Sequence, residues 1–190
     1  MLLAKWQRAI NLVGPRTIDD AWRRHFLDSA QIWPLLKRHI AGRPSPVLVD
    51  LGSGAGFPGL VLAIMASGAA VPLAVHLVES DQRKAAFLQE VARATETAVT
   101  IHALRAEALG KSGIVKADIV TARALAPVDD LLAMAEPFLL PDAICVFLKG
   151  AAVDAELTRA GETWTMSVER VPSRTDSSGT ILRIQHLGRV

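Results

Sequence analysis

The sequence contains no tyrosine and one cysteine, and aromatic residues make up only 5% of its 190 positions. The lone Cys145 cannot form a disulfide within the chain, so the fold depends on its hydrophobic core. The most apolar stretch, residues 60–75, is interrupted by Gly68 and Pro72 and is shorter than the roughly 20 residues that span a bilayer. With 51% hydrophobic and 21% charged residues, the composition is that of one soluble domain and excludes a disordered or collagen-like chain. We therefore expect a cytoplasmic protein.

The charged residues are unevenly distributed along the chain. The formal net charge of +2 is too small by itself to indicate nucleic-acid binding. Residues 1–46, however, contain eight Lys and Arg residues against three Asp, whereas residues 47–190 contain thirteen basic and sixteen acidic residues. This basic N-terminal part favours an anionic partner, although the solvated faces of ordinary helices explain the charges equally well.

From residue 47 onward, short apolar runs alternate with helical stretches. Five runs are predicted strands: Val47–Leu51, Leu73–Val78, Val99–Ala103, Asp118–Ala122 and Ala143–Leu148. Helices are predicted at Pro58–Ala66, Gln82–Ala94, Val128–Phe138 and Val153–Ala160. Apolar runs separated by helices are typical of a buried parallel sheet, so we predict a doubly wound α/β fold. Two further runs, Thr163–Val171 and Gly179–Leu187, predict a terminal antiparallel hairpin.

The beginning of the chain is predicted to be helical. Apolar residues at helical spacing predict a first helix that ends at Gly14-Pro15, namely Leu2, Trp6, Ile10 and Val13. A second helix is expected after Thr17 as its N-cap, with a buried stripe formed by Trp22, Phe26, Ala30 and Trp33. We thus predict a single domain over residues 1–190, with a basic helical extension at 1–41 and an α/β core at 47–190.

The first strand of the core runs into three alternating glycines, Gly52, Gly54 and Gly56, and then into a helix. Such glycines allow positive φ and let backbone N–H groups approach a ligand closely. The loop fits the dinucleotide-binding pattern, but Asp50 lies at its mouth, where a carboxylate would repel a pyrophosphate. That carboxylate suits the cationic amino-acid end of S-adenosylmethionine, directly or through water and backbone. The loop therefore favours S-adenosylmethionine, and a nicotinamide cofactor is the less favoured alternative.

Residues after the next two strands extend the predicted cofactor site. Glu79 ends the second strand, where enzymes of both cofactor classes bind ribose hydroxyls. Ala106 and Glu107 follow the third strand, in the loop that borders the adenine in this architecture. Phe57, just past the glycines, is expected either to line the same pocket or to pack on the sheet.

The loop after the fourth strand, residues 121–127, faces the transferred group in this architecture. It lacks the Asp or Asn with Pro-Pro and an aromatic residue that enzymes methylating exocyclic amines place there. Methylation at carbon 5 of pyrimidines needs a nucleophilic cysteine, and Cys145 is predicted to be a small core residue. Arg123 offers donors for guanine O6 and N7, for phosphate or for the cofactor carboxylate. Guanine N7 has a lone pair and no proton, so a site without an obvious base fits methylation there.

Five segments occur in the order found in one known family. They are residues 3–12, Arg24-His25-Phe26-Leu27-Asp28-Ser29, residues 50–59, Arg123-Ala124 and Leu148-Lys149-Gly150. Together they resemble the glucose-inhibited division protein B (RsmG) family, the bacterial small-subunit ribosomal RNA guanine-N7 methyltransferases, over essentially the whole chain. The family usually has Trp-Asn and Asn-Leu-Thr in the first helix, where this chain has Trp6-Gln7 and Asn11-Leu12-Val13.

The resemblance implies a Rossmann-like class I methyltransferase that transfers a methyl group from S-adenosylmethionine to N7 of a guanine in 16S ribosomal RNA, as RNA or within a small-subunit particle. It places Gly52, Phe57, Ala106 and Glu107 at the cofactor, and Arg123 at the cofactor and the target base as the catalytic residue. The expected RNA contacts are Arg24, His25, Asp28, Ser29 and Lys149.

Two other functions remain open at this point. One is a methyltransferase that acts on a small molecule or a protein, and the other is a non-catalytic RNA-binding assembly module. The five histidines are dispersed, so we expect no bound metal. We also expect no membrane association and a monomeric protein.

Overall fold

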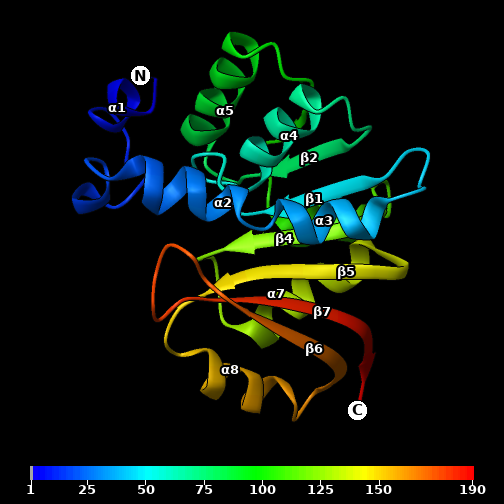
Figure 1. Cartoon of the computed structure of the whole chain (residues 1–190). Helices are drawn as coiled ribbons and strands as arrows, with labels where there is room; N and C mark the ends of the chain where they lie inside the picture. The colour runs from blue at the N-terminus through cyan, green and yellow to red at the C-terminus, as the bar shows by residue number, and fades with distance from the viewer. Residues whose placement is uncertain (1) are drawn as a thin grey trace.

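Residues 2–190, the part of the chain that the computed structural model describes, build a seven-stranded sheet flanked by helices (Figure 1). The strand order is β3-β2-β1-β4-β5-β7-β6. The first five strands run parallel, and β7 is antiparallel to both β5 and β6. The bounds are β1 (Val47–Leu51), β2 (Ala74–Val78), β3 (Thr100–His102), β4 (Ala117–Arg123), β5 (Leu139–Lys149), β6 (Trp164–Pro172) and β7 (Thr180–Arg189). This architecture confirms the predicted α/β fold with a C-terminal antiparallel hairpin.

The helices of the core follow the predicted stretches, with two differences. They are α4 (Gly59–Gly68), α5 (Gln82–Ala94), α6 (Ala106–Ser112), α7 (Val128–Ala135) and α8 (Val153–Ala160). The sequence pattern does not predict α6, because its seven residues are too few to show a helical period. Helix α7 ends before the predicted Phe138, and a 3-10 turn (η3, Glu136–Phe138) follows, since Pro137 cannot donate to the helical ladder.

The N-terminal part differs most from the prediction. It consists of α1 (Leu2–Gln7), a 3-10 turn (η1, Pro15–Thr17), a π-helical segment (η2, Trp22–Leu27), α2 (Asp28–Ala30) and α3 (Trp33–Ile40). Thr17 does not cap a helix, because its Oγ1 donates to the carbonyl oxygen of Gly14 instead (2.7 Å). The predicted stripe is not buried as a whole either, since Trp22 is 71% exposed. In a π-helical segment, residues four apart no longer share one face, which breaks the expected period.

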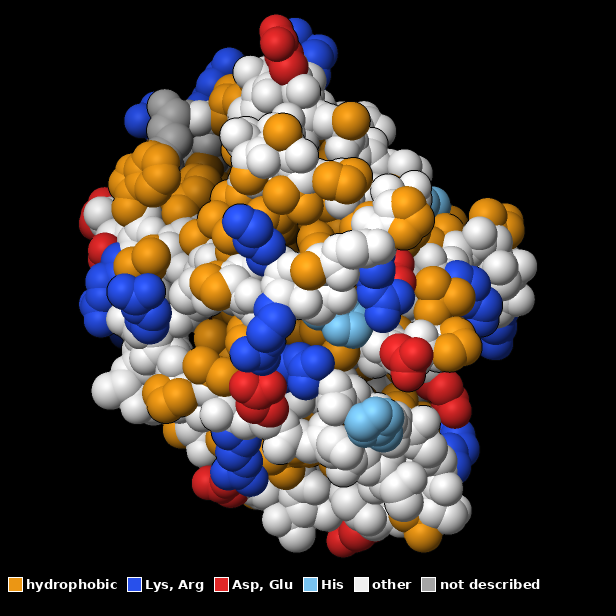
Figure 2. Space-filling model, turned by 45° about the vertical axis from the view of Figure 1, so that its right-hand side comes forward, with side chains coloured by type: hydrophobic (Ala, Val, Ile, Leu, Met, Phe, Trp, Pro, Cys, Tyr) orange, Lys and Arg blue, Asp and Glu red, His pale blue; other side chains and the backbone are white. Residues whose placement is uncertain are grey.

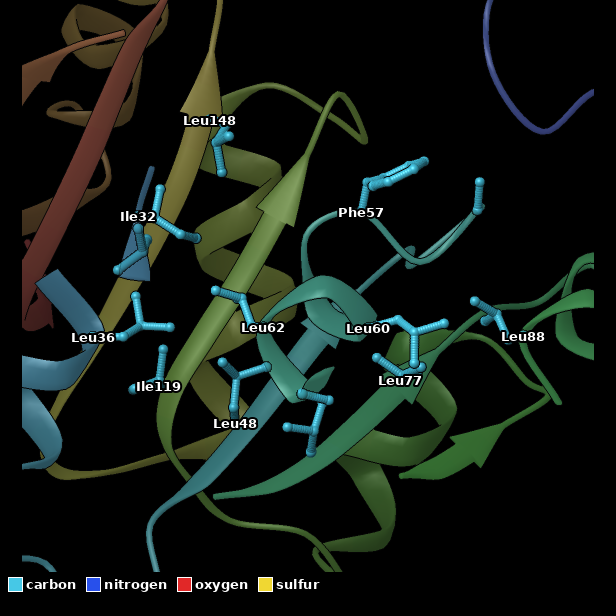
Figure 3. Close-up of a cluster of buried hydrophobic side chains, with 14 of the residues drawn as sticks. Ile32, Leu36, Leu48, Phe57, Leu60, Leu62, Leu77, Leu88, Ile119 and Leu148 are labelled. Atoms are coloured by element: carbon cyan, nitrogen blue, oxygen red, sulfur yellow. The ribbon is translucent and has the colours of Figure 1, made fainter. Parts of the chain in front are cut away.

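Buried apolar side chains form two clusters, one on each face of the sheet. Neighbouring strand residues alternate between them, as Leu48 and Val49 of β1 do. Figure 3 shows Ile32 and Leu36 of the N-terminal part packed in the same cluster as Leu48. Ile32 and Leu36 are fully buried, so the N-terminal part and the sheet share one core. Cys145 lies in the other cluster, which confirms its prediction as a core residue.

The carboxyl ends of the five parallel strands meet at one edge of the sheet, and the chain from α1 to α2 lies along this edge (Figure 1). Strands β1 and β4 are neighbours, although the chain passes through β2 and β3 between them. The connections from their ends therefore leave in opposite directions and open a crevice, where folds of this type bind ligands.

Candidate functional site

A cavity of about 540 Å³ lies at this edge, within the size range of small-molecule sites. Among its walls are most of the residues predicted for the cofactor: Gly52, Gly54, Phe57, Glu79, Ala106, Glu107 and Arg123. His25 of the N-terminal part lines it as well. The structure thus brings together residues that come from the ends of four different strands and from the N-terminal part.

The glycine loop and Glu79 are fixed against each other. Gly52, Gly54 and Gly56 have φ values of +61°, +55° and +87°, which L side chains rarely adopt. Glu79 accepts hydrogen bonds from the backbone N–H groups of Gly54 and Asp81, each at 2.8 Å. Its carboxylate is therefore held at the cavity wall, with lone pairs left for a ligand hydroxyl.

Gly56 differs from the expectation that it binds the cofactor. It does not line this cavity, and a Cβ added there would lie 2.8 Å from the Cβ of Leu60. Its lack of a side chain therefore serves the packing of the loop against α4.

Asp50 also differs from the expectation, because it does not reach the cavity. Its side chain is completely buried and accepts hydrogen bonds from Thr121 Oγ1 (2.7 Å) and from the backbone N–H of Gly59 (3.1 Å). Burial raises the pKa of Asp50 to about 6, and these hydrogen bonds limit the rise. Asp50 thus ties the first turn of α4 to β4 from below the loop.

The roof of the cavity comes from Leu12, Val13 and Gly14, which the sequence reasoning missed. Gln7 holds this segment: its Oε1 accepts from the backbone N–H groups of Leu12 and Val13 (both 3.0 Å), and its Nε2 donates to the carbonyl oxygen of Val13 (2.9 Å). Gln7 is one of the positions where the chain departs from the usual family motif, and the structure gives it this specific role. Further wall residues that the sequence did not indicate are Lys84, Leu104 and Met134.

Arg123 connects the end of β4 to the N-terminal part. Its Nη1 donates to His25 Nδ1 (3.0 Å), to the carbonyl oxygen of Arg24 (3.2 Å) and to Asp28 Oδ2 (3.4 Å). The guanidinium carbon lies 5.1 Å from the centre of the Phe57 ring, and the His25 ring stacks on the same ring at 5.2 Å. The guanidinium of Arg123 and the imidazole of His25 therefore both pack against Phe57 at the cavity wall.

The tautomer of His25 follows from these contacts. A guanidinium only donates, so Nδ1 accepts and Nε2 carries the proton, which it donates to Thr17 Oγ1 at 2.7 Å. Burial, with a further contribution from the charge of Arg123, lowers the pKa of His25 to about 4. His25 is consequently neutral at physiological pH, as the contact with Arg123 requires.

Two residues predicted to contact RNA have their polar side-chain groups engaged within the protein. Ser29 is completely buried and donates to the carbonyl oxygen of His25 (2.7 Å). The Lys149 side chain is 8% exposed, lies 2.7 Å from Glu156 Oε2 and donates to the carbonyl oxygen of Ala126 (2.8 Å). Ser29 thus stabilises the N-terminal part from inside, whereas Lys149 lines a smaller neighbouring cavity with its ammonium group already paired.

The cavity fits S-adenosylmethionine on the chemistry of its walls. The loop with positive φ permits close approach of a ligand to the backbone, and Glu79 supplies an acceptor for hydroxyl groups. Leu104, Leu125 and Met134 add apolar surface for an adenine. Within residues 2–190, no group of three or more His, Cys, Asp or Glu side chains is placed to hold a metal ion. None of the helices in the same range combines the length and apolar character that a membrane span requires.

Comparison with known proteins agrees with this geometry. Residues 1–182 match the family described as rRNA small subunit methyltransferase G (GidB). The chain is 58% identical to Ribosomal RNA small subunit methyltransferase G of Rhodospirillum rubrum, over 99% of this chain and 87% of that protein. It is 55% identical to the protein of the same name from Rhodospirillum centenum, over 98% of this chain and 80% of that one.

A solved structure with a similar fold is the ribosomal protein L11 methylase of Lactobacillus delbrueckii subsp. bulgaricus. The TM-score is 0.61 at 17% identity, and the match covers 83% of this chain and 77% of that one. This likeness extends to the fold, whereas the family match covers nearly the whole sequence. The chain therefore belongs to the rRNA small subunit methyltransferase G (GidB) family.

Proposed function

We propose that the chain transfers a methyl group from S-adenosylmethionine to N7 of a guanine in small-subunit ribosomal RNA. The observation that carries this proposal is the cavity at the β1/β4 crevice, where Glu79 and Arg123 line the same space as the glycine loop. Ligands bind at this crevice in α/β folds of this topology. The acceptor follows from the family, whose relatives are named as methyltransferases of small-subunit ribosomal RNA.

S-Adenosylmethionine, when bound, supplies a methyl carbon made electrophilic by the attached sulfonium. Gly52 and Gly54 offer their backbone to the cofactor, and Glu79 accepts hydrogen bonds from its ribose hydroxyls. Ala106 and Glu107, at the start of α6, border the adenine. Arg123 lies beside the N-terminal part, on the side of the cavity from which the target base enters.

Three side chains near the cavity that could act as a general base are not available for that role. His25 Nδ1 is occupied by Arg123, and Asp50 is buried beneath the loop. Burial also raises the pKa of Cys145 to about 12, so this thiol stays protonated. Guanine N7 offers its lone pair without losing a proton, so alignment and exclusion of water are what this protein has to supply.

The basic N-terminal part is the surface that we assign to the RNA, either free or within a small-subunit particle. Lys5, Arg8, Arg16 and Lys37 are exposed and form no ion pair among the described residues, so their charges are available to phosphates. Figure 2 shows Lys and Arg side chains across the middle of one face, below a group of hydrophobic side chains. We further infer that residues 1–190 act as one domain, which the shared core supports.

Transfer of labelled methyl from S-adenosylmethionine to small-subunit particles or their RNA, taken from a strain without this protein, tests the proposal. Mapping of the label is expected to give one N7-methylguanine. The variant Glu79→Gln should weaken cofactor binding and reduce transfer, whereas the exposed Glu162→Gln serves as the matched control. Cofactor binding without transfer to RNA, or label on another atom, would overturn the assignment.

A further inference from the structure

A second cavity, of about 200 Å³, adjoins the cofactor cavity. The two cavities share three wall residues, His25, Arg123 and Ala124. The other walls of the second cavity come from the N-terminal part, from the end of β5 and from the loop between β6 and β7. Arg123 thus lies at the boundary between the two spaces.

The walls of the second cavity are tied together by a polar network around Asp28. Its Oδ1 accepts from Thr175 Oγ1 (2.5 Å) and from Gln31 Nε2 (2.8 Å). Gln31 Oε1 in turn accepts from the backbone N–H of Arg174 (2.7 Å). The β6–β7 loop is therefore fixed to the N-terminal part, and the cavity is preformed.

Two wall residues of this cavity, Arg123 and Asp28, keep hydrogen-bonding capacity that the protein does not use. Among the described residues, all hydrogen bonds of the Arg123 side chain are made by Nη1. Its Nε and Nη2 have no hydrogen-bond partner among these residues and are not fully buried, so solvent or a ligand reaches them. Asp28 Oδ2 accepts only the long contact of 3.4 Å from Arg123.

We propose that the second cavity takes the target guanine, and that Arg123 donates to its O6 while Asp28 accepts from its N1–H. This inference rests on the proposed function and names the residues that select the base. Around the edge of guanine, N1–H, O6 and N7 follow one another. The protein presents its partners in the same order. Asp28 lines the second cavity and would face N1–H, Arg123 lines both cavities and would face O6, and the cofactor cavity lies beyond them on the side of N7. A guanine bound by these two contacts would point its N7 toward the methyl group of S-adenosylmethionine in the cofactor cavity.

The contact with Asp28 favours the transition state of the transfer. The N7 lone pair forms the new bond to the methyl carbon, the carbon–sulfur bond breaks, and its electron pair goes to sulfur. The positive charge thereby passes from sulfur to the base, and no proton is released. A growing positive charge makes N1–H a stronger donor to the Asp28 carboxylate, so this hydrogen bond strengthens as the reaction proceeds.

Adenine presents the reverse pattern, with a donor at N6 and an acceptor at N1. The N6 donor would face the Arg123 donor, and the N1 acceptor would face the carboxylate of Asp28. Polar groups buried without a partner in this way strongly disfavour binding of the wrong base. The pair therefore discriminates guanine from adenine, although both purines carry an N7.

The test uses the small-subunit RNA with its mapped target guanosine replaced by inosine or by 2-aminopurine through ligation. Inosine keeps O6 and N1–H, so the wild-type protein is expected to methylate it at a rate within about threefold of guanosine. 2-Aminopurine keeps N7 but lacks O6 and has an acceptor at N1, and its kcat/KM is expected to fall roughly 10- to 100-fold or more. Equal rates on guanosine and 2-aminopurine would overturn the inference. Failure on guanosine itself would instead overturn the proposed function.

The variant Asp28→Asn tests whether Asp28 is the residue that recognises N1–H of the guanine. Asn keeps one oxygen for Thr175 and Gln31, and its amide N–H2 then faces the base and matches the N1 acceptor of 2-aminopurine. The preference for guanosine over 2-aminopurine should therefore shrink at least about tenfold. The exposed Asp19→Asn removes another carboxylate of the N-terminal part outside this network, and it should leave the preference unchanged. An unchanged preference in Asp28→Asn, or an equal loss in Asp19→Asn, would overturn the role of Asp28.

Discussion

Arg123 Nη1 lies 3.0 Å from His25 Nδ1, and this contact joins the end of β4 to the N-terminal part. It requires an unprotonated Nδ1, which the lowered pKa of His25 provides. Through Thr17, which donates to Gly14, the same imidazole also reaches the roof segment. One neutral histidine therefore helps to hold a wall that both cavities share.

The stability contributed by His25 should depend on pH. The native state keeps this imidazole neutral down to about pH 4, whereas the unfolded chain takes up a proton near the ordinary value of about 6.5. Between these values the unfolded state binds more protons, so acidification destabilises the fold. The difference in free energy of unfolding between the wild type and His25→Gln should shrink from pH 7 to pH 5. Urea unfolding of both proteins measures it.

The comparison with His25→Gln removes the contributions of the other titrating groups. Burial lowers the pKa of His39, His76 and His102 as well, but these residues are present in both proteins. The raised pKa of Asp50 acts in the opposite direction between about 4 and 6 and also cancels. A difference that stays constant or grows on acidification would contradict the prediction.

Gly59 should tolerate no side chain. A Cβ at this position would lie 2.6 Å from both the Cβ of Asp50 and a methyl carbon of Leu77, so Gly59→Ala is expected to lower stability by about 1–3 kcal/mol or more through overpacking. Gly68 lies in the same helix with nothing within 4 Å of an added Cβ, so Gly68→Ala should be neutral or stabilising by up to ~1 kcal/mol. Thermal or urea unfolding of both variants distinguishes them, and equal effects would contradict the packing argument.

Removal of the Gln7 side chain should loosen the roof of the cofactor cavity. Gln7→Ala removes three hydrogen bonds to Leu12 and Val13, so we expect the Kd for S-adenosylhomocysteine to rise roughly 5- to 10-fold. The exposed Gln89→Ala on α5 is the matched control and should not change the affinity. Titration calorimetry provides the measurement. An unchanged affinity would mean that the roof does not contact the ligand.

Lys149 should matter for stability and should make no phosphate contact. It is almost buried and bonds Glu156 and the loop after β4, so Lys149→Ala is expected to cost on the order of 2 kcal/mol. The exposed Lys111→Ala should leave stability nearly unchanged. The salt dependence of RNA binding by the folded Lys149→Ala protein should match that of the wild type, because the ammonium group is already paired with Glu156. A reduced salt slope would instead indicate a phosphate contact.

The core of the fold was readable from the sequence because parallel strands are buried on both faces. Runs such as Val47–Leu51 stand out from the helices around them, and a glycine loop marks the strand end that carries the site. Glu79 was placed correctly at the cavity wall by the same argument, since it ends a neighbouring strand.

The direction in which individual side chains point could not be predicted from the sequence. Asp50 and Glu79 both lie near strand ends, yet one points beneath the loop and the other lines the cavity. Strand periodicity predicts that neighbouring side chains alternate, but not which face opens onto the ligand. The roof at Leu12 and the contact of Asp28 with Thr175 depend on tertiary packing between distant segments, for which a single sequence carries no local signal.

The bond between Asp28 and Thr175 joins residues 147 positions apart. A ribosome that adds about 5–20 residues per second needs roughly 7 to 30 seconds to make the chain between them. The walls of the larger cavity come from residues 12–134, whereas those of the smaller one extend to residue 181. During translation, all wall residues of the cofactor cavity are therefore synthesised before the last ones that enclose the base.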